Sequence, residues 1–84
     1  MAQPIPQDYM AYDRTIVVFS PDGRLIACAD GYGLIYIWDV TTGELLAILH
    51  GHSKAVSAIS FSPDGRVLAS GGLDGTILIW QSSR

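Results

Sequence analysis

A repeat of 42 residues constrains this chain more than any other feature of its sequence. The hexapeptide Phe-Ser-Pro-Asp-Gly-Arg at 19–24 recurs at 61–66, and Trp38 recurs as Trp80, again 42 positions later. The chain has 84 residues, which is the length of two such units. A fixed period of this size is typical of proteins that stack one small structural unit on the next, because a single unit cannot bury its apolar face alone.

Each unit is predicted to consist of short β-strands. Four apolar runs of the first unit, at 15–19, 25–29, 34–38 and 45–49, are separated by turn residues. Ser-Pro-Asp-Gly supplies the first turn in both units, since proline fixes φ and the residues after it tolerate turn conformations. Runs such as 16–19 and 77–80 are apolar on both faces, which indicates strands covered on both sides. We therefore expect an all-β fold made of β-propeller blades, two four-stranded antiparallel blades per chain.

Several motifs of the second unit stand at fixed spacing. They are Leu-His-Gly-His at 49–52, Phe-Ser-Pro-Asp-Gly at 61–65, Leu-Ala-Ser-Gly-Gly at 68–72, Asp-Gly-Thr at 74–76 and Ile-Trp at 79–80, and the first unit adds Trp38-Asp39. This pattern resembles the WD-repeat β-propeller family. The resemblance implies one two-blade unit over 1–84, with the first repeat at 9–50 and the second formed by 51–84 together with residues 2–7.

The outer strand of the second repeat is predicted to come from the N-terminal segment. The fourth strand of the first unit, moved back by 42 positions, falls on residues 2–7, where Pro4 and Pro6 flank Ile5. Prolines at alternate positions place both missing amides on one side, which only an edge strand tolerates. Ring closure in the WD-repeat family implies that Pro4, Ile5 and Pro6 complete the blade begun by the C-terminal segment.

Two blades cannot close a ring, so we expect ring closure by homo-oligomerisation, with a strand exchanged between protomers as in domain swapping. If the chain is complete, the number of blades is even. A homotetramer of eight blades is the first choice and a homotrimer of six the second. Two alternatives stay open: the chain is an excised piece of a longer protein, or it is a minimal or engineered ring-former with no partner but itself.

Three residues of the second unit have the side chains of a hydrolytic site. Ser70, His52 and Asp74 could act as nucleophile, base and orienting acid, which makes a hydrolase using Ser70 and His52 a distant alternative. The family resemblance instead assigns them, with Trp80, to a buried structural tetrad in which hydrogen bonds satisfy all four side chains. We expect no catalytic residues and no enzyme activity.

The first unit departs from the tetrad pattern. The equivalent positions hold Met10, Cys28, Tyr32 and Trp38, so apolar packing is expected to replace the hydrogen bonds, with Cys28 a small buried hydrophobe. His50 and His52 form a His-x-His pair, but no third ligand is placed by motif, and neither a metal site nor a cofactor is predicted.

Composition excludes several functional classes. The net charge is −3 and the five basic residues are scattered, so no nucleic-acid footprint is visible. The apolar runs are far shorter than the ~20 residues of a membrane-spanning helix, and no membrane association is expected. One cysteine cannot make an intrachain disulfide, which fits a cytoplasmic setting.

The predicted function is a non-catalytic protein-interaction scaffold that binds itself, and protein or peptide partners are a further expectation. WD-repeat proteins usually bind partners on the rim formed by the loops at one end of the blades. Tyrosine is a favoured interface anchor. The candidate rim residues are Tyr9, Tyr12, Tyr32, Lys54 and Leu73.

Overall fold

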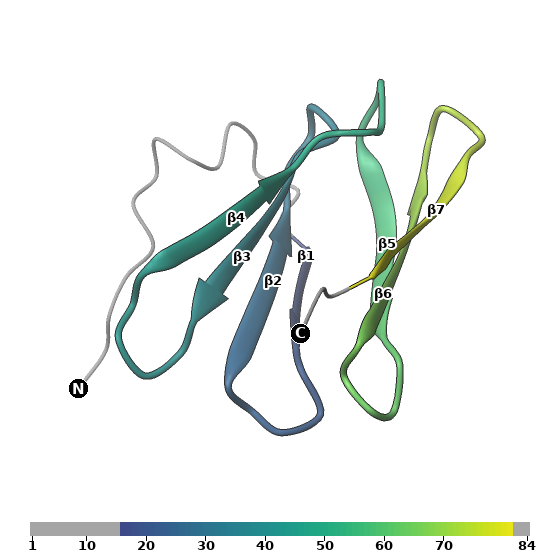
Figure 1. The fold of residues 1–84 in the computed structure, drawn as a ribbon. Coiled ribbons are helices and arrows are strands. Elements are labelled where there is room, and N and C mark those ends of the chain that lie inside the picture. Colours follow the sequence, from purple (N-terminus) through teal and green to yellow (C-terminus); the bar gives the residue numbers. More distant parts are fainter. Residues whose placement is uncertain (1–15, 82–84) are drawn as a thin grey trace.

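The computed structural model describes residues 16–81, which form two antiparallel sheets (Figure 1). The first sheet has the order β1-β2-β3-β4, and the second has the order β5-β6-β7. The strands are β1 (Ile16–Phe19), β2 (Leu25–Ala29), β3 (Ile35–Asp39), β4 (Leu45–Leu49), β5 (Val56–Phe61), β6 (Val67–Gly72) and β7 (Ile77–Gln81). Every neighbouring pair is consecutive in sequence, as in a meander.

The strands of the first unit lie close to their predicted positions. β2 and β4 coincide with the predicted runs 25–29 and 45–49. β3 begins one residue later than predicted, because the Leu34 carbonyl closes the preceding turn by accepting from the Asp30 amide at 3.1 Å. The predicted start of the first strand at residue 15 lies outside the described residues.

The two Ser-Pro-Asp-Gly turns have the same hydrogen bonds. Ser20 Oγ donates to Asp22 Oδ1 at 2.7 Å, and Ser62 Oγ donates to Asp64 Oδ1 at the same distance. Each aspartate also accepts from the backbone two residues on, and these hydrogen bonds lower the pKa of both carboxyl groups. The glycine that ends the first turn, Gly23, has a φ of 74° in otherwise open space, so its backbone conformation alone explains the residue.

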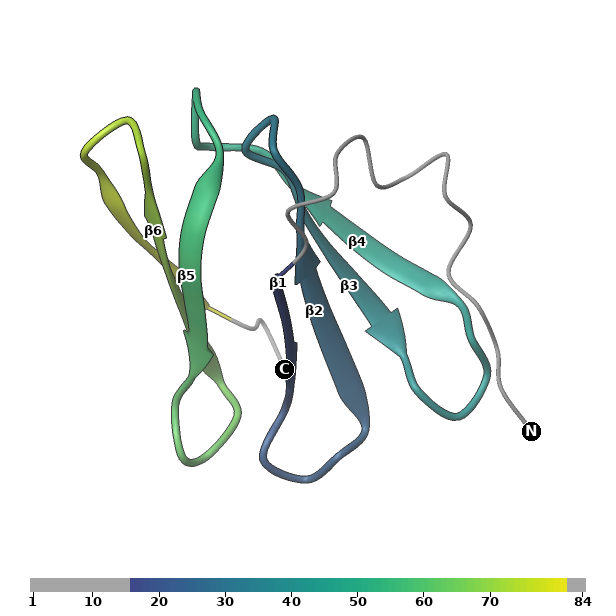
Figure 2. The ribbon, with the colours of Figure 1, turned by 180° about the vertical axis from the view of Figure 1, so that it is seen from behind.

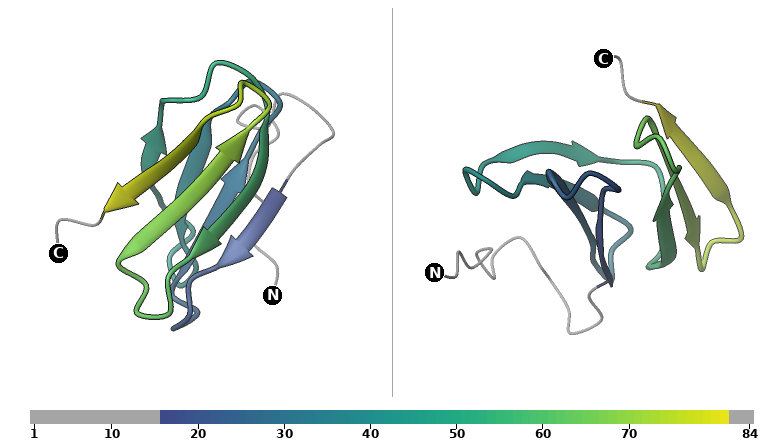
Figure 3. Two further views of the ribbon diagram at one scale, coloured as in Figure 1. Left: turned by 90° about the vertical axis from the view of Figure 1, so that its right-hand side faces the viewer. Right: turned by 90° about the horizontal axis from the view of Figure 1, so that it is seen from below.

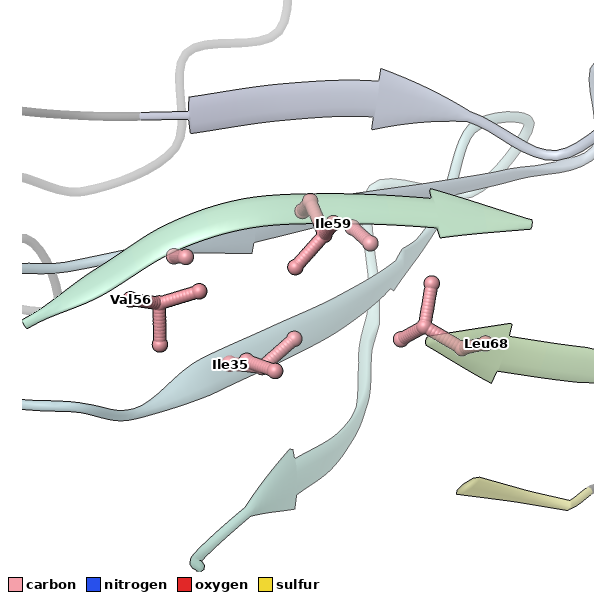
Figure 4. Packing of buried hydrophobic residues seen from close by; sticks show 6 residues of the cluster. Ile35, Val56, Ile59 and Leu68 are labelled. Atoms are coloured by element: carbon pink, nitrogen blue, oxygen red, sulfur yellow. The ribbon is translucent and has the colours of Figure 1, made fainter. Parts of the chain in front are cut away.

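The two sheets pack face to face, with β1 next to β5 (Figures 2 and 3). Small and branched side chains meet between them. From the first sheet come Ala27, Ala29 and Ile35, and from the second come Val56, Ile59 and Leu68. Figure 4 shows Ile35 opposite Val56, Ile59 and Leu68, which is the centre of the core.

The two sheets differ at their outer edges. β4 pairs with β3, but within residues 16–81 no strand pairs with the equivalent edge of β7. The second sheet therefore has three described strands, and the segment predicted to supply the fourth, with Pro4, Ile5 and Pro6, lies outside the described residues. None of the described residues belongs to a helix long and apolar enough to cross a membrane.

Candidate functional site

Ser70 is the centre of a hydrogen-bonded chain on the inner face of the second sheet. Its Oγ lies 2.8 Å from Trp80 Nε1 and 2.7 Å from His52 Nε2. An indole N–H can only donate, so Trp80 donates to Ser70, and the serine hydroxyl donates in turn to His52 Nε2. This order leaves the proton of the neutral imidazole on Nδ1.

The other imidazole nitrogen faces two oxygen atoms. His52 Nδ1 lies 3.1 Å from Thr76 Oγ1 and 3.4 Å from Asp74 Oδ1. Thr76 Oγ1 donates to Asp74 Oδ1 at 2.7 Å, so it can accept from the imidazole. The hydrogen bonds from Thr76 and from the Ser53 amide hold the pKa of Asp74 far below its usual value. The structure thus brings together His52, Ser70, Asp74 and Trp80, and adds Thr76, which sequence reasoning missed.

The burial of Ser70 opposes a hydrolytic role. Ser70 and His52 are both buried, and the Ser70 hydroxyl is in contact with an indole on one side and an imidazole on the other. A nucleophile needs an exposed oxygen within reach of the substrate carbonyl. These side chains instead satisfy one another in the interior.

The first sheet has a different polar network, centred on Asp30. Asp30 is 1% exposed, and its Oδ2 accepts from the Tyr36 hydroxyl at 2.9 Å. Its Oδ1 accepts from the amides of Tyr32 and Leu34. Burial and the neighbouring carboxylate raise the pKa of Tyr36 to about 12.

The expectation that apolar packing replaces the tetrad in the first unit is confirmed at Cys28 and Trp38, but the Asp30 network was not predicted. Cys28 does pack with Tyr36 and Trp38 in an apolar cluster, and its burial raises the pKa of the thiol. Beside them, however, a buried carboxylate is retained, because three hydrogen bonds compensate for its desolvation. The equivalent residue in the second sheet is Gly72. This difference between the two repeats is the sequence feature from which a separate role of Asp30 could have been predicted. Met10 lies outside the described residues.

Three of the candidate rim residues lie in loops at one end of the sheets. A β-carbon on Gly33 would meet the backbone of His52 and Lys54, and the Leu73 amide donates to the Ala55 carbonyl at 2.9 Å. The loops that carry Tyr32, Lys54 and Leu73 thus pack on one another, and all three residues are exposed. Tyr9 and Tyr12 lie outside the described residues.

The two histidines of the His-x-His pair have different surroundings. His50 is exposed after the end of β4, whereas His52 is buried with both ring nitrogens in the network. Among residues 16–81, no group of three or more His, Cys, Asp or Glu side chains is placed to hold a metal ion.

Comparison with known proteins identifies the family. The family model described as WD domain, G-beta repeat (WD40) matches the chain twice, over residues 12–39 and 43–81. The chain belongs to the WD-repeat family. WD-repeat propeller domains are typically non-catalytic protein-interaction scaffolds.

The chain spans less than a tenth of the length of the curated relatives described here. It is 50% identical over 46 residues to the probable serine/threonine-protein kinase PkwA of Thermomonospora curvata, covering 55% of this chain and 6% of the relative. It is 45% identical over 49 residues to mouse (Mus musculus) Protein Atg16l2, covering 57% of this chain and 8% of that protein.

A solved WD-repeat structure has the same arrangement of strands. The Myceliophteria thermophila Cps50 (Swd1) β-propeller domain matches with a TM-score of 0.75 and 30% identity, over 82% of this chain and 23% of that one. The two sheets of this chain are thus similar to a portion of a larger propeller.

Proposed function

We propose that this WD-repeat chain is a non-catalytic protein-interaction scaffold whose copies close a propeller ring by homo-oligomerisation. The observation that carries the proposal is a pair of equivalent residues. Ile35 in the first sheet is fully buried against the second sheet, whereas Ile77, 42 positions later, leaves 77% of its surface exposed. An isoleucine exposed to this extent on a sheet face is explained if a further blade covers it.

One edge of β7 is paired with no strand of residues 16–81, which supports the exchange of a strand. Between β4 and β7 lies a groove of about 390 Å³ whose walls include Leu46, Leu49 and Trp80. A strand that paired with β7 would place side chains in this groove. We propose that residues 2–7 of a second copy form that strand, because the 42-residue repeat makes them equivalent to β4.

The register of β4 fits a proline at position 6. The Val40 amide donates to the Arg24 carbonyl. Backbone amides along a strand point alternately to its two neighbours, so the Tyr36 amide, four residues before Val40, also faces β2. Ile48 lies opposite Tyr36, and its own amide therefore points away from β3. Pro6 is 42 positions before Ile48, where the ladder needs no donor.

The proposed ring has four copies and eight blades, with three copies and six blades as the second choice. We propose a cytoplasmic location for this ring. Its loops with Tyr32, Lys54 and Leu73 would bind protein or peptide partners. Aromatic and long apolar side chains beside a cation suit a partner segment with apolar and acidic residues.

The absolute mass of the full chain, measured by light scattering after size exclusion over a range of concentrations, tests this proposal. A mass of four or three times 9.0 kDa is expected. A folded monomer at every concentration would overturn the self-assembly.

A further inference from the structure

Four aspartates of this chain are followed directly by glycine, at 22–23, 30–31, 64–65 and 74–75. Aspartate before glycine is the pair at which a protein backbone rearranges most readily, because glycine has no β-carbon to hinder the approach of its own nitrogen to the aspartate side chain. The product is isoaspartate, in which the backbone runs through the side-chain carboxyl. Each of the four bonds is therefore a candidate site of spontaneous modification.

The rearrangement has two steps and needs no reactant except water. The glycine nitrogen attacks the aspartate Cγ and a C–N bond forms, while the carboxyl OH leaves with the amide proton as one water. The cyclic imide then takes up one water at either of its carbonyl groups and opens to aspartate or isoaspartate. The first step requires a protonated carboxyl group, a glycine N–H that is free to react, and a side chain that can rotate towards it.

Two of the four aspartates are buried among several hydrogen-bond donors. Asp30 is 1% exposed, and its carboxylate accepts from two amides and a phenol. The Asp74 side chain is 8% exposed and accepts from the amides and hydroxyls of Ser53 and Thr76. Neither side chain can turn towards its glycine without breaking these hydrogen bonds in the interior.

The other two aspartates, Asp22 and Asp64, are exposed in the Ser-Pro-Asp-Gly turns. In each turn the serine contacts both reacting groups. Its carbonyl accepts from the glycine amide at 2.9 Å, and its hydroxyl donates to the aspartate Oδ1 at 2.7 Å. The serine thus binds the nitrogen that would attack and holds the carboxylate that would be attacked.

The same hydrogen bonds keep both exposed carboxyl groups ionised. The amide two residues on and the serine hydroxyl are the two largest causes of the lowered pKa of Asp22. The same two groups, with the hydroxyl first, lower the pKa of Asp64. An ionised carboxylate cannot release an OH group, so these hydrogen bonds oppose formation of the imide.

We propose that this chain forms isoaspartate at the Asp-Gly bonds 22–23 and 64–65, and that the hydroxyls of Ser20 and Ser62 restrain the reaction. Isoaspartate adds one methylene group to the backbone between the serine carbonyl and the glycine amide. It therefore breaks the hydrogen bond that closes the turn between β1 and β2, or between β5 and β6.

The serine of each turn can be removed separately, so each turn is a control for the other. Full-length Ser20→Ala and Ser62→Ala are compared with the wild type and with Ser57→Ala, which removes a hydroxyl that donates to a backbone carbonyl. All chains are incubated folded at mildly acidic pH and then digested. The isomeric peptides have equal masses, so they are separated by chromatography and assigned by fragmentation.

Ser20→Ala should accelerate isoaspartate formation at 22–23 about tenfold, the factor that corresponds to the loss of one hydrogen bond to a charged group, and leave 64–65 unchanged. Ser62→Ala should do the converse, and Ser57→Ala should react as the wild type does. In the wild type, 22–23 and 64–65 should react before 30–31 and 74–75.

Three results would overturn the inference. Equal acceleration at all four bonds would show that the serines act only through the stability of the whole chain. Unchanged rates at the altered turn would show that the hydroxyl restrains nothing. A wild-type chain that reacts first at 30–31 or 74–75 would show that burial does not protect these bonds. If one serine variant does not fold, the other decides alone.

Discussion

Gly72 leaves the space that the His52 imidazole occupies: a β-carbon on Gly72 would lie 2.5 Å from His52 Nδ1 and 2.7 Å from Asp74 Oδ1. The glycine is required here by this close approach. The equivalent residue in the first sheet is Asp30. Its side chain occupies this region and takes part in a different hydrogen-bonded network. The two sheets therefore satisfy their buried polar atoms in two ways.

Replacement of Gly72 by alanine should displace the imidazole from its partners. We expect the free energy of unfolding to fall by about 1–3 kcal/mol, the usual cost of overpacking. Gly71→Ala is the matched control, since its β-carbon would meet nothing closer than Ser57 Oγ at 4.0 Å. Urea denaturation at equal protein concentrations measures both. Equal stabilities of the two variants would show that His52 can move without cost.

Removal of the Ser70 hydroxyl should destabilise the chain without changing any hydrolytic activity. Ser70→Ala leaves Trp80 Nε1 and His52 Nε2 without the oxygen between them, and a buried group left unsatisfied costs about 1–3 kcal/mol. Ser57→Ala, which removes an exposed hydroxyl, is the control. Denaturation and hydrolysis of p-nitrophenyl acetate are measured together. Lost esterase activity at unchanged stability would favour the hydrolase alternative.

The repeat made the strands and turns predictable, because Ser-Pro-Asp-Gly and the apolar runs act locally. The partners of Ser70 were also predicted, since family resemblance identifies them by spacing. The Asp30–Tyr36 hydrogen bond was not, because an aspartate at a strand end usually caps an exposed turn. The register of β2 and β3 shows that the Asp30 and Tyr36 side chains lie on one face, since Cys28 pairs with Tyr36 and Asp30 follows Cys28 by two residues. Residue types alone also could not show that Ile35 is buried and Ile77 exposed, which depends on the neighbouring sheet.

The Tyr36 phenol should make stability depend on alkaline pH. Its pKa in the folded chain is about 12, above the ordinary value of 10.0, so the folded state retains a proton that the unfolded state loses. This contribution is fully present below pH 10 and is lost as the pH rises towards about 12. Tyr36→Phe should abolish it. Tyrosinate absorbance follows the titration, and denaturation at each pH gives the stability difference. A difference between wild type and variant that stays constant from pH 9 to 12 would contradict the assignment.

Gly33 is expected to be the costlier of two glycines with positive φ. Its φ is 93°, and a β-carbon there would meet the carbonyl oxygens of His52 and Lys54. Gly23 has a φ of 74° but no neighbour within 4 Å. Gly23→Ala should therefore cost only the left-handed conformation, about 1–2 kcal/mol. Gly33→Ala adds overpacking, for a total of roughly 2–5 kcal/mol. Because the Gly33 contact joins the loops of Tyr32 and Lys54, this variant should also increase hydrogen exchange of the Tyr32 and Leu34 amides. Equal losses of stability in the two variants, with unchanged exchange in the loop, would show that backbone conformation alone requires Gly33 and that the rim loops are held together by other contacts.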